Sequence, residues 1–153
     1  MRATHLLVVT ATAIVLAAAA DLSARWGDEA AIRQTVQYYF DGGTSRDSVA
    51  LRKAFHPDAR MLFARDGRLV VVPIEEFIAR VAGERLKPGE VDSTRKRVTS
   101  VDVTGDAAIA RIELKRPEGL IVDYMSLLKV EGRWRIVNKI FSRETRREHV
   151  SGS

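Results

Sequence analysis

The chain has 153 residues, of which 46% are hydrophobic, 25 are Lys or Arg and 20 are Asp or Glu, so its formal net charge is +5. A chain of this length and apolar content can bury one core, and we expect a single domain. The sequence contains no cysteine, which excludes disulfides, thiolate metal sites and cysteine nucleophiles. Its basic residues are dispersed except at Arg95-Lys96-Arg97 and Arg146-Arg147, so we expect no nucleic-acid partner.

The first 20 residues have the composition of a secretory signal peptide. Arg2 precedes an uncharged stretch from Leu6 to Ala20 that ends in small residues, the order found in such signals. The stretch is shorter than the ~20 residues of a membrane-spanning helix, which favours cleavage after Ala20 over retention as an anchor. We therefore predict a periplasmic or secreted protein without membrane contact after cleavage. Its parts are a signal peptide over 1–20, a linker over 21–27, a domain over 28–144 and a flexible tail over 145–153.

Two helices are predicted at the start of the domain. Apolar residues recur at helical spacing between Asp28 and Phe40, and Gly42-Gly43 should end this first helix. Thr44 and Ser45 supply hydroxyls that can cap a second, short helix. That helix should end before Pro57, because the residue preceding a proline disfavours helical geometry.

A hairpin and a third helix should follow. The segment "ARMLFARDGRLVVV" is typical of two short strands joined at Asp66-Gly67, a strong hairpin dipeptide. Strand alternation turns Met61 and Phe63 inward, since Arg60 must point to solvent. Pro73 fits the first turn of a helix that should end at Gly83.

From about Arg97 onward the hydrophobic period is two, which predicts about four antiparallel strands. In the last hairpin we expect Trp134 and Val130 both to face the core. Both residues can face the core only if the strands are joined by a three-residue loop that ends in Gly132 with a left-handed backbone. It directs further residues of the last two strands inward: Leu120, Val122, Tyr124, Ser126, Leu128, Ile136, Asn138 and Ile140.

The predicted fold class is therefore α+β, with a strongly curved antiparallel sheet wrapped around about three N-terminal helices. The segments "YYFDGGTSRDSVALRKAFHPDARM", "VVVPIEEFIARV" and "DYMSLLKVEGRWRIVNKIFSRE" resemble the nuclear transport factor 2-like superfamily, and within it the lumazine-binding and SnoaL-like group. The resemblance covers residues 28–144. It implies a cone-shaped barrel with a pocket at its open end, often dimerised through the outer sheet face. The superfamily contains both enzymes and binding domains, so function has to be argued from the site.

The candidate ligand-binding residues are Tyr39, Phe63, Tyr124, Ser126 and Asn138. We expect Asn138 on the concave face opposite Tyr124 or Ser126, where an unpaired amide would cost about 1–3 kcal/mol and so requires a partner, a water or a ligand. An internal Asn138–Tyr124 hydrogen bond without any ligand is the alternative. Tyr39 should offer its phenol to the mouth of the cone, or else be a core aromatic.

Catalytic residues are harder to find. Ketosteroid isomerases of this superfamily pair a helix tyrosine with two acids, and here Tyr39 matches the tyrosine. However, Phe63 stands in the place of the base and Ser126 near that of the second acid, so we do not expect that mechanism. His56 and Asp58 are the remaining weak acid/base candidates, although His-Pro-Asp is also ordinary turn chemistry.

Other polar residues suggest no further site. Asp41 is interpreted as a helix-end residue and Asp123 as an outward-facing one. With one histidine in the domain, we expect no metal site, and no cofactor is indicated.

Three functions remain open. The first is an exported binding domain for an apolar or aromatic small molecule, favoured because no recognisable catalytic set is present. The second is a SnoaL-like isomerase, dehydratase or cyclase that uses His56 or Asp58. The third is a dimeric interaction module with a vestigial pocket. A homodimer is predicted through the outer sheet face, where we expect four apolar side chains: Met125, Leu127, Val137 and Phe141.

Overall fold

The computed structural model describes residues 25–84 and 92–145. A helix covers residues 25–45 and is followed by α2 (Ser48–Ala54), β1 (Phe55–Arg65), β2 (Arg68–Pro73) and α3 (Ile74–Gly83). Four strands complete the domain: β3 (Arg95–Thr104), β4 (Ala107–Arg116), β5 (Gly119–Val130) and β6 (Arg133–Thr145). The predicted signal peptide, residues 21–24 of the linker and residues 146–153 of the tail lie outside the described residues.

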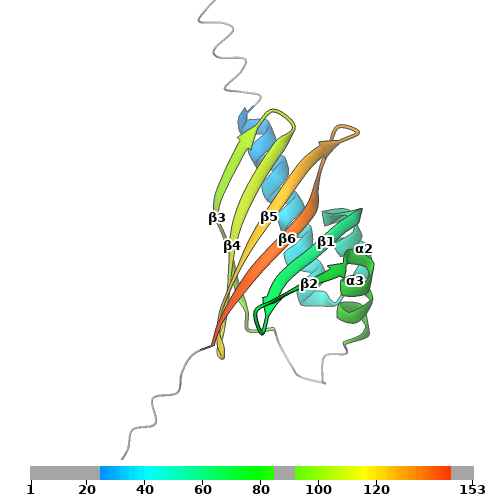
Figure 1. The fold of residues 1–153 in the computed structure, drawn as a ribbon. Helices are drawn as coiled ribbons and strands as arrows, with labels where there is room; N and C mark the ends of the chain where they lie inside the picture. Colours follow the sequence, from blue (N-terminus) through cyan, green and yellow to red (C-terminus); the bar gives the residue numbers. More distant parts are fainter. Residues whose placement is uncertain (1–24, 85–91, 146–153) are drawn as a thin grey trace, which may run out of the picture.

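One six-stranded sheet has the order β2-β1-β6-β5-β4-β3. Its neighbouring strands are antiparallel except for β1 and β6, which are parallel. The N-terminal helix lies along one face of this curved sheet, while α2 and α3 lie beside β1 and β2 (Figure 1). The predicted α+β arrangement is confirmed. The sheet stays open, since β2 and β3 are at opposite ends of the strand order.

The N-terminal helix does not end at its two glycines, contrary to the prediction. It continues to residue 45 and ends at Arg46, whose φ of 57° is left-handed. Gly42 serves close packing instead, because a Cβ there would lie 2.7 Å from the Leu51 side chain and 2.9 Å from the Leu51 backbone nitrogen. The glycine thus lets α2 approach the helix.

The cap of α2 is Asp47 rather than Thr44 or Ser45. The Asp47 carboxylate accepts from the backbone N–H of Val49 at 2.7 Å and of Ala50 at 3.3 Å. Thr44 and Ser45 instead donate back to carbonyls one turn earlier in the N-terminal helix. Such back-bonding competes with capping for the same hydroxyls.

The last hairpin has a two-residue turn, not the predicted three-residue loop. Val130 pairs with Arg133, and both turn residues, Glu131 and Gly132, have positive φ of 51° and 74°, as two-residue hairpins require. The Asp66-Gly67 turn has the same form, with φ of 52° and 73°, as predicted. Because the β5–β6 loop is one residue shorter than predicted, each β5 side chain lies on the face of the sheet opposite to the predicted one.

The inward residues of β5 are therefore Asp123, Met125 and Leu127, which are buried, while Tyr124 is exposed. The prediction that Tyr124 and Ser126 face the core is wrong. The prediction that Met125 and Leu127 form an outer interface is also wrong, because both belong to the core.

A bulge in β6 changes the face of that strand as well. Leu127 pairs with Ile136, but Ser126 pairs with Asn138, so Val137 is an extra residue. Ile136 is inward before the bulge and Lys139 is inward after it. Asn138 lies opposite Ser126, as one predicted register had it, but on the outer face rather than the concave one.

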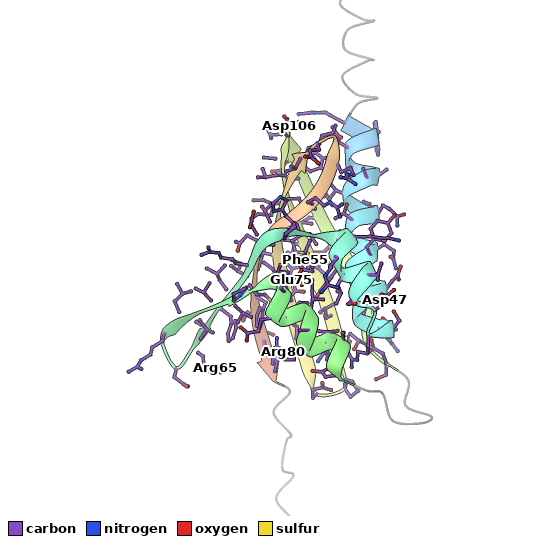
Figure 2. The ribbon with its side chains drawn as sticks, turned by 90° about the vertical axis from the view of Figure 1, so that its right-hand side faces the viewer. Asp47, Phe55, Arg65, Glu75, Arg80 and Asp106 are labelled. Carbon is purple, nitrogen blue, oxygen red and sulfur yellow. The ribbon has the colours of Figure 1, made fainter. Side chains whose placement is uncertain are left out.

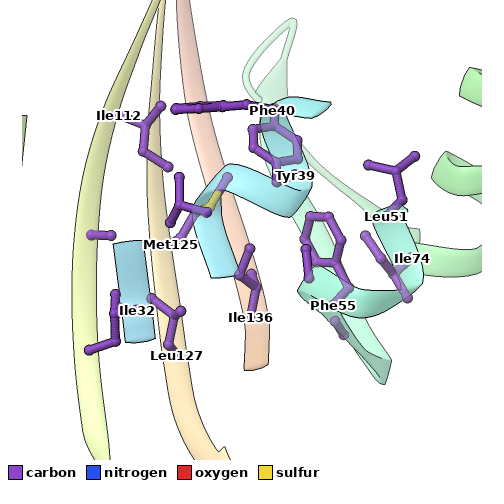
Figure 3. Packing of buried hydrophobic residues seen from close by; sticks show 14 of the residues in the cluster. Ile32, Tyr39, Phe40, Leu51, Phe55, Ile74, Ile112, Met125, Leu127 and Ile136 are labelled. Carbon is purple, nitrogen blue, oxygen red and sulfur yellow. The ribbon is translucent and has the colours of Figure 1, made fainter. Parts of the chain in front are cut away.

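The core lies between the N-terminal helix and the inward face of the sheet (Figure 3). The helix contributes Ile32, Val36, Tyr39 and Phe40, which pack against Met125, Leu127 and Ile136 among others. Phe141 packs against this cluster too, so its predicted place on the outer face is wrong. Within residues 25–84 and 92–145, no helix is long and apolar enough to cross a membrane.

Candidate functional site

A cavity of about 980 Å³ opens at one end of the concave face. Its walls come from the end of the N-terminal helix, β1, α3, residues 92–94, the start of β3 and the adjoining ends of β4, β5 and β6. Five aromatic side chains line it: Tyr39, Phe40, Phe63, Phe77 and Phe141. Its size is typical of small-molecule sites.

The cavity lining is strongly basic. It carries seven basic residues, Arg46, Arg65, Arg80, Lys96, Arg116, Lys139 and Arg143, against three acidic ones, Glu84, Asp92 and Glu118. Arg65 lies at the end of β1, and Arg80 lies on α3 (Figure 2). The excess of positive charge favours an anionic ligand.

A buried polar group joins three elements at this end of the core. Tyr39, on the N-terminal helix, donates its hydroxyl to Asp123 Oδ2 on β5 at 2.9 Å. Lys139, on β6, donates to the Tyr39 oxygen at 3.1 Å. Lys139 Nζ also lies 3.1 Å from Asp123 Oδ1, and the exposed side-chain fractions of the pair are 6% and 0%. Tyr39 and Lys139 line the cavity.

Two buried polar atoms near the cavity have unused hydrogen-bonding capacity. Asp123 Oδ1 is at ion-pair distance from Lys139, yet it accepts no hydrogen bond of good geometry from the described residues. Arg46, in the cavity lining, has a buried Nε without a partner among these residues. Ordinary cores rarely leave such atoms unpaired.

Aromatic rings surround the Lys139 ammonium group. Nζ lies 5.0 Å from the ring centre of Phe141, 5.2 Å from that of Tyr39 and 5.7 Å from that of Phe77. Burial lowers the pKa of Lys139 from its usual value, although the Asp123 carboxylate opposes the shift. The ammonium therefore loses its proton more readily than that of an exposed lysine.

Tyr39 is held in its protonated form. Burial, together with the negative charge of Asp123, raises the pKa of its phenol well above the ordinary value. The phenol is thus a stable hydrogen-bond donor to Asp123 and an acceptor from Lys139.

The residues expected from the sequence are divided between two faces. Tyr39 and Phe63 line the cavity. Tyr124, Ser126 and Asn138 lie on the outer face and do not line the cavity, for the reasons of turn length and bulge given above.

The His56–Asp58 pair is a local feature of β1. His56 Nδ1 accepts from the backbone N–H of Asp58 at 3.2 Å and lies 3.6 Å from its carboxylate. Neither residue belongs to the cavity lining. His56, Pro57 and Asp58 lie within β1, in the stretch between Phe55 and Arg60 where its pairing with β6 is irregular, so the predicted turn is wrong.

Asp123 and Lys139 were not predicted from the sequence as site residues. Asp123 was expected to face outward, and no acid was expected beside Tyr39, and both expectations are wrong. A signal did exist, since Asp123 alternates with Ile121, Met125 and Leu127 on an apolar face. Lys139 gave no comparable signal because the bulge at Val137 interrupts its alternation.

Comparisons with known proteins agree with the fold. A family model described as "Putative lumazine-binding" matches residues 27–142. No curated protein matches the chain. Among solved structures, an NTF2-like protein of unknown function from Shewanella baltica is 28% identical, with a TM-score of 0.69 over 78% of this chain and 95% of that one. A second, from Silicibacter pomeroyi, is also 28% identical, with a TM-score of 0.67 over 76% and 96% of the two chains.

Proposed function

This chain belongs to the family described as "Putative lumazine-binding", and we propose that it binds a small organic anion with an apolar or aromatic body in the cavity lined by Tyr39 and Lys139. The observation that carries the proposal is the buried Lys139 ammonium, which faces a basic cavity with aromatic walls. The aromatic lining would cover the body of the ligand, and the cations would pair with its charge.

The proposal is tested with a matched pair of ligands. 2-Naphthoate and 2-naphthamide have the same ring system but differ in charge, and calorimetry measures the affinity of each. We expect the carboxylate to bind more tightly by about tenfold or more, because a charge-assisted hydrogen bond contributes about 1.5–3 kcal/mol. Equal affinities, or no binding of either, would refute the proposal.

A matched variant locates the site. Lys139→Met should weaken 2-naphthoate binding, whereas Lys53→Met, at an exposed lysine of α2 outside the cavity, should not. Native mass spectrometry of protein purified from its own cells would show whether a small anion is retained. Its mass would then identify the natural ligand class.

We also propose a homodimer through the outer sheet face. Four apolar side chains form a row across neighbouring strands, through the pairs Val71–Leu62, Leu62–Ile140 and Ile140–Tyr124. Val71, Ile140 and Tyr124 are 44%, 47% and 42% exposed. A second copy related by a two-fold axis could cover this row. Sedimentation should show a dimer that Ile140→Lys converts to a monomer, and a wild-type monomer at micromolar concentration would refute it.

Export is proposed from the composition of residues 1–20. N-terminal sequencing of the protein from its own cells should find Asp21 as the first residue. A mature chain that still begins at Met1 would contradict this.

A further inference from the structure

We propose that Lys139 acts as a nucleophilic amine that condenses with the carbonyl group of an anionic aldehyde or ketone held in the cavity, forming an iminium ion. The inference rests on the proposed function, because the cavity must first bind the organic anion. It adds covalent chemistry at one atom, Lys139 Nζ. Nζ combines burial, a cavity-facing position and two polar neighbours, Tyr39 and Asp123, at 3.1 Å.

The environment distinguishes Lys139 from other described lysines. Lys129 is paired with Asp28 at 2.7 Å, and this contact raises its pKa. Lys96 also lines the cavity, but its ammonium is bound to Asp92 at 2.6 Å and to Thr44. Burial instead lowers the pKa of Lys139. An amine that is neutral more often at neutral pH is the stronger nucleophile toward a carbonyl group.

Lys139 is surrounded by side chains from the N-terminal helix, α3, β4, β5 and β6. Asp123 on β5 opposes deprotonation, while the positive charges of Arg116 on β4 and Arg143 on β6 favour it. Tyr39 on the N-terminal helix accepts from Nζ, and Phe77 on α3 contributes only its ring. The two arginines also line the cavity, where they could pair with the carboxylate of the substrate.

The step balances without any external oxidant or reductant. The Lys139 ammonium gives a proton to Asp123, and the freed nitrogen lone pair attacks the carbonyl carbon while the C–O π electrons move to oxygen. Two of the three ammonium protons pass to that oxygen, with Asp123 as the carrier. The C–O bond then breaks, water leaves, and the nitrogen lone pair forms the C=N bond. The third proton stays on the iminium nitrogen.

The local charges suit this step. Asp123 Oδ1 accepts no hydrogen bond of good geometry from the described residues, so it is free to receive a proton. The product iminium carries the same single positive charge as the ammonium it replaces. The buried pair with Asp123 is therefore kept, and no uncompensated charge is created in the core.

The test traps the iminium ion in the wild-type protein. The protein is incubated with 4-formylbenzoate and cyanoborohydride, which reduces an iminium to a stable secondary amine, and peptide mapping gives the labelling rate at each lysine. We expect Lys139 to be labelled about tenfold faster than exposed Lys53 at pH 7, because the cavity holds the aldehyde next to Nζ. Labelling of Lys139 no faster than Lys53 would overturn the proposal.

A variant and a second ligand separate this proposal from the proposed function. Lys139→Arg keeps the charge but removes the nucleophile, so it should form no adduct at position 139. If 2-naphthoate binds but Lys139 is not preferentially labelled, only the covalent step is wrong, whereas loss of both refutes the binding site. The comparison of lysines within one wild-type molecule stands even if a variant fails to fold.

Discussion

The two ends of the concave face use polar residues in different ways. The end away from the cavity, where the N-terminal helix begins, is called the closed end. There, Asp28 accepts from Trp134 Nε1 at 2.9 Å and from Lys129 at 2.7 Å, and Thr35 donates to the Trp134 carbonyl at 3.1 Å. At the cavity end, Asp123 and Lys139 are buried deeper, yet Asp123 Oδ1 accepts no good hydrogen bond from the described residues. Polar residues at the closed end fasten the helix to the sheet. At the cavity end, Tyr39 and Lys139 join the helix to the sheet as well, but they also line the cavity.

The largest effect should follow from breaking the buried pair. Asp123→Asn or Lys139→Met leaves one charge unpaired in the core, which should lower the free energy of unfolding by about 3–5 kcal/mol in urea titrations. The double variant Asp123→Leu/Lys139→Met removes both charges and should return to within about 1 kcal/mol of wild type. It should nevertheless fail to bind 2-naphthoate. A double variant that binds as tightly as wild type would show that the pair serves the core alone.

A core truncation at the closed end should separate stability from binding. Leu127→Ala removes a fully buried side chain and should cost about 2–5 kcal/mol in the same titrations. Calorimetry of the folded variant should give an unchanged 2-naphthoate affinity, since Leu127 does not line the cavity. A large loss of affinity would mean that the two ends are not independent.

Gly42→Ala tests the packing next to the cavity. The new Cβ would meet the Leu51 side chain at 2.7 Å and its backbone at 2.9 Å, so we expect a cost of about 1–3 kcal/mol despite the better helix propensity of alanine. Gly43→Ala is the matched control, because a Cβ added there would have no described atom within 4 Å outside its own helical turn. Equal stabilities of the two variants in thermal unfolding would contradict the role given to Gly42.

The smallest effect concerns the pH dependence at the closed end. Hydrogen bonds from Lys129 and Trp134 lower the pKa of Asp28 from 3.8. The folded state thus binds this proton more weakly than the unfolded state, and the stabilisation is complete above pH 3.8 and lost as pH falls through the lower folded value. Wild type should therefore exceed Asp28→Asn in Tm at pH 7, and the difference should shrink as the pH falls below 3.8. A Tm difference that does not change with pH would show that the charge of Asp28 does not contribute to the stabilisation.

The sequence was sufficient for the elements and for part of the cavity. Helical spacing predicted α3, the Asp66-Gly67 dipeptide predicted the β1–β2 turn, and alternation placed Phe63 toward the cavity. It was insufficient for Asp123 and Lys139. Both faces of β5 are similarly apolar in sequence. Which of them is turned toward the core therefore depends on whether the β5–β6 turn has two or three residues. The bulge at Val137 then changed the face of β6, and nothing in the local sequence specified it.

The central claim is that the Lys139 ammonium binds an organic anion, and NMR of protein labelled with ¹⁵N at the lysine side chains tests it most directly. Titration with 2-naphthoate should shift the Nζ resonance of Lys139 in proportion to binding and leave those of Lys53 and Lys129 in place. 2-Naphthamide should cause little shift at any lysine. An unmoved Lys139 resonance at saturating 2-naphthoate would contradict the account.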